Sequence, residues 1–243
     1  MQLKGNWKLG MQDAATPVME HIHSMHNFAL VIVAGIFVFV VALLFYIIFR
    51  FRDNPKPSET SHNTWLEIFW TLIPCLIIFI MAVPSFKLLY LEENPPDADM
   101  TLKVLAHQWY WSYEYPDHDG ISFDSYMKQD EDLLPGEKRL LAVDNMVVVP
   151  ADTNIRVLVT SADVIHSWAV PAFGVKTDAV PGRLNETWFR AQKEGDFYGQ
   201  CSELCGMLHG FMPIGVRVVS KDKFAEWVDE AKGDDESEVK QES

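Results

Sequence analysis

The apolar residues of the chain follow two different patterns, one near the N-terminus and one after it. An uncharged apolar run extends from Phe28 to Phe49, and a second run extends from Leu66 to Leu91 with charges only near its ends. At a rise of about 1.5 Å per residue, each run can cross the hydrocarbon core of a bilayer, which is about 30 Å thick. The pattern predicts two membrane-spanning helices, over about residues 28–50 and 65–91.

The segment between the two runs is short, polar and rich in proline. It contains Arg50, Arg52 and Lys56, and short basic loops stay on the cytoplasmic side of a membrane. Both flanking segments are therefore expected on the opposite side. Residues 1–27 lack the order of basic, apolar and small residues that marks a signal peptide. Either a signal has been removed, or the first helix acts as the insertion signal.

After residue 91 the pattern changes to the alternation that is typical of strands. A polar linker at 92–99 leads into short segments rich in β-branched and aromatic residues, which turn sequences separate. These segments are 101–115, 139–150, 154–161, 186–192, 196–201 and 213–220. Such a series predicts a β-sandwich or barrel. One amphipathic helix ends this domain, which we place at 92–232, with apolar residues at helical spacing: Phe224, Trp227, Val228 and Ala231.

The acidity of the chain belongs to this second part. The formal net charge is −14, and from residue 92 onward there are 29 acidic and 14 basic residues. Some of the acidic residues lie in 233–243, whose composition predicts a disordered tail. The remainder suits a basic protein partner, and we expect no contact with nucleic acid.

Two cysteines, a histidine and a methionine lie close together after the last predicted turns: Cys201, Cys205, His209 and Met212. Taken alone, the two cysteines predict a disulfide, because the topology places them in an oxidising compartment. Thiolate, imidazole and thioether together, however, are ligands that suit copper. A second histidine, His166, follows a predicted strand and can join the set.

The number of ligands narrows the choice of metal. A mononuclear blue-copper site needs one cysteine, two histidines and a weak axial methionine, so this set has one thiolate too many. Zinc accepts two cysteines and two histidines but leaves Met212 without a role. Two thiolates can bridge two metal ions, and the set therefore favours a binuclear copper centre.

Three segments resemble subunit II of cytochrome c oxidase, of the alphaproteobacterial and mitochondrial kind. They are "HQWYWSYEYP" at 107–116, "HSWAVPAFGVKTDAVPGR" at 166–183 and "GQCSELCGMLHGFMPI" at 199–214. The resemblance implies a two-helix transmembrane hairpin followed by an all-β cupredoxin domain, a Greek-key barrel. It also implies a place in the bacterial inner membrane with this domain in the periplasm, or alternatively in the mitochondrial inner membrane.

The resemblance assigns the binuclear copper centre of this family, CuA, to six positions: His166, Cys201, Glu203, Cys205, His209 and Met212. Cys201 and Cys205 would bridge the two copper ions, and Glu203 would contribute its backbone carbonyl. The side chain of Glu203 would also reach a magnesium ion shared with subunit I.

Partners follow from the same resemblance. Cytochrome c would deliver electrons through Trp109, near acidic residues of the docking face: Glu114, Asp117, Asp119, Asp144 and Asp163. The electrons would pass to heme a in subunit I, which with heme a3 and a further copper, CuB, reduces oxygen to water while protons are pumped. Subunit III would be another partner. Glu67 would stand at the mouth of a proton pathway into subunit I, although a wet interfacial carboxylate is the simpler interpretation of that residue.

Other protein classes share parts of this pattern. A quinol oxidase subunit has the same anchor and barrel without the copper ligands, all of which are present here. A nitrous oxide reductase domain lacks the two-helix hairpin, and a membrane-tethered blue-copper carrier lacks one cysteine. A disulfide-stapled structural protein is the remaining alternative. The chain has no C-x-x-C-H sequence, so we expect the electron to arrive on a separate carrier.

Overall fold

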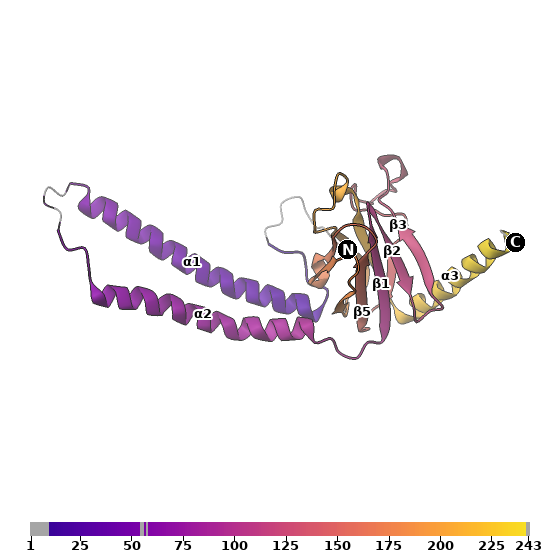
Figure 1. Cartoon of the computed structure of the whole chain (residues 1–243), viewed down its shortest axis with the longest axis horizontal. Coiled ribbons are helices and arrows are strands. Elements are labelled where there is room, and N and C mark those ends of the chain that lie inside the picture. Colours follow the sequence, from indigo (N-terminus) through magenta and orange to yellow (C-terminus); the bar gives the residue numbers. More distant parts are fainter. Residues whose placement is uncertain (1–9, 54–55, 57, 242–243) are drawn as a thin grey trace. The chain divides into compact units, whose positions relative to one another are not determined.

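The computed structural model describes residues 10–53, 56 and 58–241, with side chains described as far as residue 233. The chain divides into two compact units (Figure 1). One unit is the helical hairpin, His21–Tyr90. The other, which we call the head, combines Met1–Glu20 with Leu91–Ser243.

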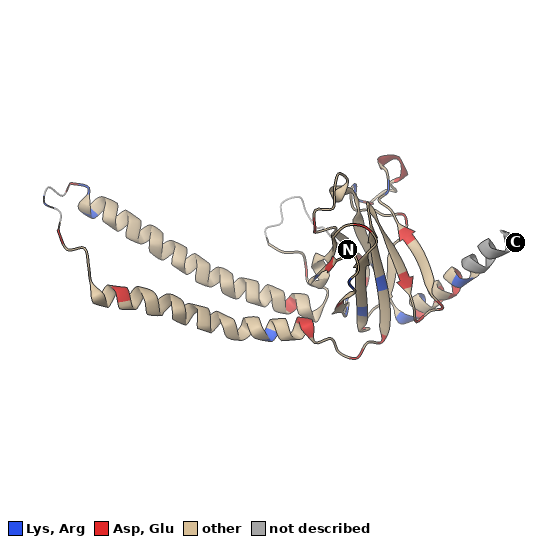
Figure 2. Ribbon diagram, viewed as in Figure 1, with Lys and Arg blue, Asp and Glu red and all other residues tan. Residues whose placement is uncertain are grey.

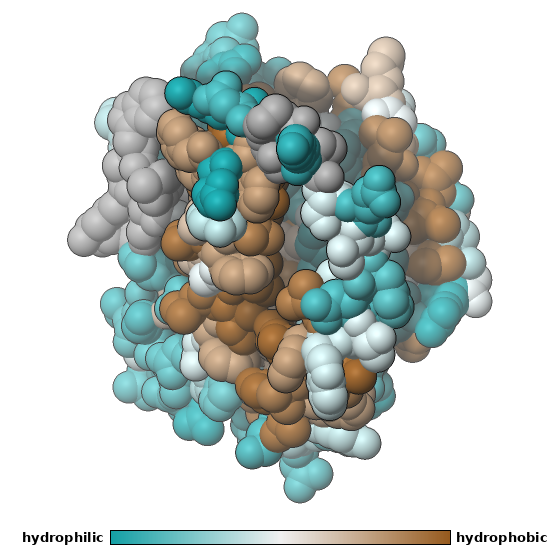
Figure 3. Space-filling model, turned by 90° about the vertical axis from the view of Figure 1, so that its left-hand side faces the viewer, coloured by the Kyte–Doolittle hydropathy of each residue, from teal (hydrophilic) through white to brown (hydrophobic). Residues whose placement is uncertain are grey.

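The hairpin is formed by two long apolar helices, α1 (Pro17–Phe51) and α2 (Thr64–Glu93). Both are long and apolar enough to cross a membrane, and their apolar side chains are largely exposed. Brown, apolar residues cover much of the surface drawn in Figure 3, where the loop end of the hairpin is nearest the viewer. The two predicted spans are present, and lipid is the environment that such surfaces require.

Helix α1 begins earlier than the predicted residue 28. Thr16 caps it, because the hydroxyl Oγ1 accepts a hydrogen bond from Met19 N at 3.1 Å, and Pro17 follows at the first helical position. Both features favour a helix start at this point. The apolar run marks only the part of the helix that suits lipid.

The head contains all of the strands. Their bounds are β1 (Met100–His107), β2 (Tyr110–Tyr115), β3 (Ile121–Ser125), β4 (Val147–Pro150), β5 (Ile155–Ser161), β6 (His166–Val170), β7 (Val175–Ala179), β8 (Asn185–Phe189), β9 (Gly195–Gln200) and β10 (Pro213–Val219). They form sheets with the orders β3-β2-β1-β5-β8, β4-β10-β9 and β6-β7. The pairs β1–β5 and β4–β10 are parallel, and the others are antiparallel. One apolar core joins the three sheets, which confirms the predicted all-β domain.

Several predicted strand bounds were wrong. The segment 101–115 is two strands that turn at Gln108 and Trp109, and β4 occupies only the end of 139–150. Leu140 has a φ of 68°, which no strand residue adopts. Strands β3, β6 and β7 were missed. All five residues of β6 are buried, so this strand lacks the alternation that reveals a half-buried strand.

The described N-terminal residues belong to the head. Ala15 N donates to Ala172 O at 2.9 Å, and Gln192 N donates to Ala15 O at 2.8 Å. Thr16 Oγ1 donates to Phe173 O at 2.7 Å. The segment before α1, which the sequence assigned to a separate N-terminal region, therefore lies on the barrel like a short added strand.

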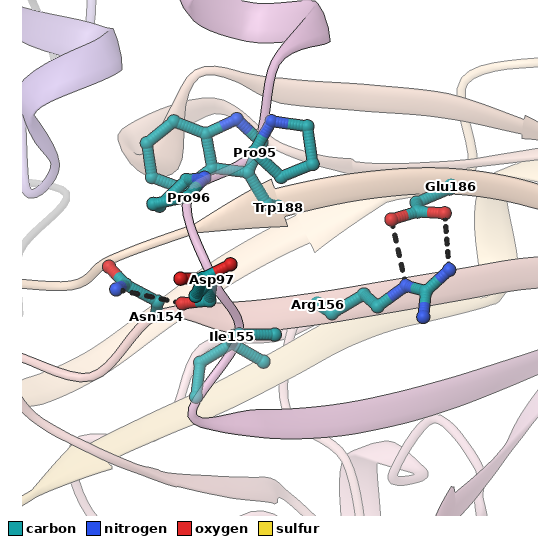
Figure 4. A pocket seen from close by; sticks show the side chains of 9 residues that line it. Pro95, Pro96, Asp97, Asn154, Ile155, Arg156, Glu186 and Trp188 are labelled. Atoms are coloured by element: carbon teal, nitrogen blue, oxygen red, sulfur yellow. Dashed lines mark hydrogen bonds and ion pairs between the residues drawn. The ribbon is translucent and has the colours of Figure 1, made fainter.

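The last turn of α2 and the linker after it are also attached to the strands of the head. The Trp188 indole Nε1 donates to the carbonyls of Leu91 and Glu92, at 3.3 and 3.1 Å, and Asn154 Nδ2 donates to the carbonyl of Asp97 at 3.2 Å. Beside it lies a pocket of about 180 Å³ (Figure 4), in which Arg156 and Glu186 form a bidentate ion pair. The linker thus has a fixed course over β5 and β8.

A C-terminal helix, α3 (Lys221–Gln241), packs on the barrel through Phe224 and Val228, which are buried, with Trp227 and Ala231 partly buried. This confirms the predicted helical face. The helix continues to Gln241, beyond residue 232, where we expected it to end. The disorder predicted for 233–243 is not tested by this backbone assignment, and residues 242–243 lie outside the described residues.

Candidate metal centre

The candidate ligands come from the ends of three strands. His166 is the first residue of β6, Cys201 directly follows β9, and Met212 directly precedes β10. Because β9 and β10 are antiparallel, with Pro213 opposite Gln200, the residues that follow and precede them are neighbours. Cys205 and His209 lie in the connection 201–212, which we call the ligand loop.

The donor atoms form one connected cluster. Cys201 Sγ lies 3.8 Å from Cys205 Sγ and 3.9 Å from His166 Nδ1. Cys205 Sγ lies 3.5 Å from His209 Nδ1 and 3.5 Å from Met212 Sδ. The backbone oxygen of Glu203 lies 3.4 Å from Cys201 Sγ. The structure therefore brings together all six positions that the sequence singled out.

Both cysteines of the cluster are free thiols in the structure. Their sulfur separation of 3.8 Å places the two thiols where both can bind one or more soft metal ions. Cys75, the remaining cysteine, lies in α2 and is exposed on the helix surface.

Four of the six ligand residues are buried, His209 is half-buried and the side chain of Glu203 is exposed. The exposed fractions of the ligand residues are 0% for His166, 6% for Cys201, 3% for Cys205 and 1% for Met212. Burial raises the pKa of both thiols, but at Cys201 the hydrogen bonds with His166 and the backbone of Ser167 lower the pKa to about 7. At Cys205, burial and the negative charge of Cys201 raise the pKa to about 12. The first proton of the pair therefore leaves more easily than the second, and binding of a cation favours loss of both.

His166 is oriented by a carboxylate. Its Nε2 donates to Asp163 Oδ1 at 2.9 Å, which leaves Nδ1 to face the thiols. A metal-binding histidine usually has such a partner, which fixes the ring and its tautomer. The sequence suggested only a docking role for Asp163, and its hydrogen bond to His166 was not predicted.

Two tryptophans contact the backbone of the ligand set. Trp109, half-buried, donates from Nε1 to Cys205 O at 3.2 Å. Trp111, fully buried, donates from Nε1 to Met212 O at 3.1 Å and lies edge-on to the His166 ring. The alternation of β2 predicts that Trp111 is a core residue, which is correct. Alternation cannot show that this core residue also contacts Met212 and His166.

The predicted docking acids do not lie together. Strand β2 begins beside Trp109 and ends at Tyr115, and Asp117 and Asp119 lie in the turn after it. They are therefore at the far end of the strand from Trp109, about 20 Å away for six residues. Asp119 is paired with Lys232, and Glu114, within β2, is paired with Lys103 at 2.9 Å.

Asp144 and Asp163 lie at the Trp109 end. Asp144 Oδ1 accepts from Tyr126 N at 2.7 Å, and the Tyr126 ring stacks on Tyr110, the neighbour of Trp109. Figure 2 shows acidic residues along the strands and loops of the head. Of the five predicted acids, the structure brings two to the candidate entry site.

Glu67 lies in the first turn of α2. Its Oε1 lies 2.7 Å from His62 Nδ1, and its side chain is 41% exposed. Asn63 caps this helix by accepting a hydrogen bond from Leu66 N. A carboxylate in this turn stabilises the helix, so the helix position alone explains Glu67 without a proton pathway.

A barrel with a largely buried cluster of thiols, imidazoles and a thioether at one end, joined to two long apolar helices, is typical of a membrane-anchored copper protein of the cupredoxin class. The family model described as "Cytochrome C oxidase subunit II, periplasmic domain" matches residues 100–219, and the model for the transmembrane domain of the same subunit matches residues 4–88. The chain belongs to the cytochrome c oxidase subunit II family.

Similar proteins agree with this assignment. A probable cytochrome c oxidase subunit 2 of Rickettsia bellii is 54% identical over 91% of this chain and 83% of that protein. The cytochrome c oxidase subunit 2 of Arabidopsis thaliana is 50% identical over 91% of this chain and 88% of that protein. The crystal structure of the periplasmic domain of the Bradyrhizobium japonicum subunit II has 60% identity and a TM-score of 0.55, and covers 58% of this chain and 99% of that one. A second structure, a mixed disulfide between a thioredoxin-like protein and a subunit II of cytochrome c oxidase, has 59% identity and a TM-score of 0.52, and covers 59% of this chain and 98% of that one.

These findings confirm the family resemblance and the cupredoxin fold with its two-helix anchor. The chain is a membrane subunit of a heme–copper oxidase, an oxidoreductase complex in which it is associated with subunit I. Copper and electron transport follow from the family.

Proposed function

We propose that this chain is the electron-entry subunit of its oxidase and holds a binuclear copper centre with the six residues of the cluster. The donor set supports the proposal. Two thiolates, two imidazoles and a thioether are the soft and borderline ligands that copper prefers, and their donor atoms lie within contact distance of one another in a largely buried cluster. The observation that carries the proposal is the pair of free thiols between two histidines.

Two copper ions held by these residues would supply one-electron transfer, with the charge spread over both ions, so that little rearrangement of atoms would accompany each transfer. The chain's own contribution is to hold the donors still. Strands β6, β9 and β10 fix His166, Cys201 and Met212, and Asp163 fixes the His166 ring. Burial of the cluster keeps water from reorganising around the charge.

We place the electron entry at Trp109, with cytochrome c as the donor and heme a of subunit I as the acceptor. The indole is partly exposed and is hydrogen-bonded to the carbonyl of Cys205. It therefore offers a short path of bonded and hydrogen-bonded atoms from the surface to a ligand. Asp144 is the best-placed acid to attract a lysine-rich carrier to this end of the barrel, because it lies beside the Tyr126–Tyr110 stack.

Three further assignments belong to the same proposal. The exposed carboxylate of Glu203 would bind magnesium together with ligands from subunit I. Glu67, beside the exposed His62, would receive protons on the cytoplasmic side for subunit I, with subunit III completing the assembly. The membrane is the inner membrane of a bacterium, with the head in the periplasm, or that of a mitochondrion.

Metal analysis of the purified oxidase tests the centre. We expect two copper ions per copy of this chain in addition to the copper of subunit I, with visible and near-infrared absorption and a multi-line EPR signal. His209→Asn should abolish this signal, whereas Met212→Leu should shift the reduction potential and retain the metal, because a thioether is the weak ligand. A single copper, or zinc at full occupancy, would contradict the binuclear assignment.

A further inference from the structure

The turn between β1 and β2 is bound to the ligand loop by two side chains. Gln108 donates from Nε2 to Cys205 O at 2.8 Å. Trp109, the next residue, donates from Nε1 to the same oxygen at 3.2 Å. One carbonyl of a metal-ligand residue thus accepts two side-chain hydrogen bonds from adjacent positions of a surface turn.

The backbone of the same turn is bound to a second ligand through Asp163. Gln108 N donates to Asp163 Oδ2 at 2.6 Å, and His166 Nε2 donates to Asp163 Oδ1 at 2.9 Å. A chain of hydrogen bonds therefore runs from His166 through Asp163 and Gln108 to Cys205. It joins two ligands that are far apart in sequence by a route that passes through the turn carrying Trp109.

Gly206 shows how closely the turn and the loop approach each other. Its φ is +122°, and a Cβ at this position would lie 3.0 Å from Trp109 Cζ2 and 3.1 Å from Gln108 Nε2. A side chain there would be strained by the backbone and would push against both residues. The glycine allows the turn to rest directly on the ligand loop.

The carboxylate of Asp163 is used within the protein. Besides Gln108 and His166, it accepts a hydrogen bond from Val164 N at 2.6 Å, and its side chain is 31% exposed. A carboxylate that accepts several such bonds is held in one geometry. The structure thus gives Asp163 a role in orienting the site, and the docking role predicted from the sequence stays a prediction.

We propose that Gln108 is a positioning residue for electron entry. Together with Asp163 it braces the β1–β2 turn against the ligand loop, so that the Trp109 indole stays on the Cys205 carbonyl. An exposed glutamine loses side-chain entropy when it is ordered, and the bond to Cys205 O is what holds it. The inference rests on the proposed function, in which electrons enter through Trp109.

The test replaces Gln108 with methionine, which is neutral and similar in length but cannot donate a hydrogen bond. In the assembled oxidase, loss of one hydrogen bond should lower the equilibrium constant between the braced and the released turn about fivefold. Flash-induced transfer from bound cytochrome c should therefore become measurably slower, by at most about fivefold. The dissociation constant for cytochrome c should change by less than about twofold, because Gln108→Met changes no charge. The copper content should be unchanged.

A second measurement does not depend on electron transfer. Hydrogen exchange of the backbone amides of 201–212 in the assembled oxidase should become about fivefold faster in Gln108→Met, because the loop loses one of its attachments. Gln192→Met is the matched control. Gln192 is also exposed, and it lies before β9, at the end opposite to Cys201, so neither quantity should change.

The possible outcomes separate this proposal from the proposed function. If Gln108→Met and Gln192→Met give the same transfer rate and the same hydrogen exchange, Gln108 does not position the turn. The same conclusion holds if Gln108→Met alters only the dissociation constant for cytochrome c. If exchange accelerates while transfer is unchanged in both Gln108→Met and Trp109→Phe, the brace is present but electrons enter elsewhere, and it is the entry site of the proposed function that fails.

Discussion

At the scale of single residues, the two cysteines of the ligand loop have identical side chains but contact different donor atoms. Cys201 contacts His166 and the carbonyl of Glu203, whereas Cys205 contacts His209 and Met212. Each thiol thus contacts one histidine and one weaker donor, and the two sulfur atoms lie 3.8 Å apart. Both sulfur atoms are therefore within reach of the same metal ions.

Glu67 supports a prediction at the same scale. Its replacement by alanine should slow oxygen turnover of the assembled oxidase several-fold while the copper spectrum and reduction by cytochrome c stay unchanged. The reason is that Glu67 lies in the hairpin, at the opposite end of α2 from the linker that leads into the head. Steady-state oxygen consumption and the optical spectrum are the two measurements.

A control for Glu67 lies in the loop before α2. Glu59, an exposed acidic residue of the preceding loop, should tolerate alanine without a change in turnover. Normal turnover in Glu67→Ala would leave this carboxylate with the helix-stabilising role that its place in the first turn of α2 already explains.

At the scale of secondary-structure elements, the start of α1 carries a prediction about stability. Thr16→Val removes the helix cap and leaves the Phe173 carbonyl without its donor. The cap contributes about 1 kcal/mol, and a buried acceptor left without a partner costs about 1–3 kcal/mol. The free energy of unfolding of the head should fall by about 2–4 kcal/mol, which lowers its Tm by roughly 4–16 °C for a unit of this size.

Thermal unfolding of the full-length chain in detergent, followed by near-ultraviolet circular dichroism, measures this change. Thr16→Ser keeps the hydroxyl and should retain most of the stability, so it separates the hydrogen bonds from the loss of a methyl group. Equal Tm values for Thr16→Val and the original chain would mean that the N-terminal segment does not contribute to the stability of the head.

Elements also show which parts of the structure can be predicted from the sequence. The hairpin and the face of α3 were predictable because long apolar runs and helical spacing are local signals. The ligand residues were identified by their chemistry. The added N-terminal segment and the attachment of Gln108 to Cys205 were not predictable, because both join residues about 100 or more positions apart. Strand β6 was missed because complete burial removes the alternation.

At the scale of the whole molecule, the net charge is −14. The acidic residues are spread over the head, so only those near Trp109 can attract cytochrome c to that end of the barrel. Asp144→Asn keeps an acceptor for Tyr126 N and removes one charge near Trp109. The rate at which the Asp144→Asn oxidase associates with cytochrome c should be about twofold lower than that of the original oxidase at low salt. The two rates should become equal as the salt concentration increases.

Asp119→Asn is the matched control for that measurement. At an ionic strength of 0.1 M the Debye length is about 10 Å, whereas Asp119 lies at the other end of β2 and is paired with Lys232. Stopped-flow association rates over a range of salt concentrations should therefore separate the two variants. Equal effects of Asp144→Asn and Asp119→Asn would indicate a docking face away from the Trp109 end.

The hydrogen bond between Ala15 and Ala172 limits how many times the chain between them can cross a membrane. Two residues that share a hydrogen bond occupy the same aqueous compartment, so the chain between them must pass through a bilayer an even number of times. The helices α1 and α2 satisfy this parity, and a single span could not. In a membrane, residue 15 and the barrel must therefore lie on the same side, and residue 15 can form this contact only after more than a hundred further residues have been synthesised.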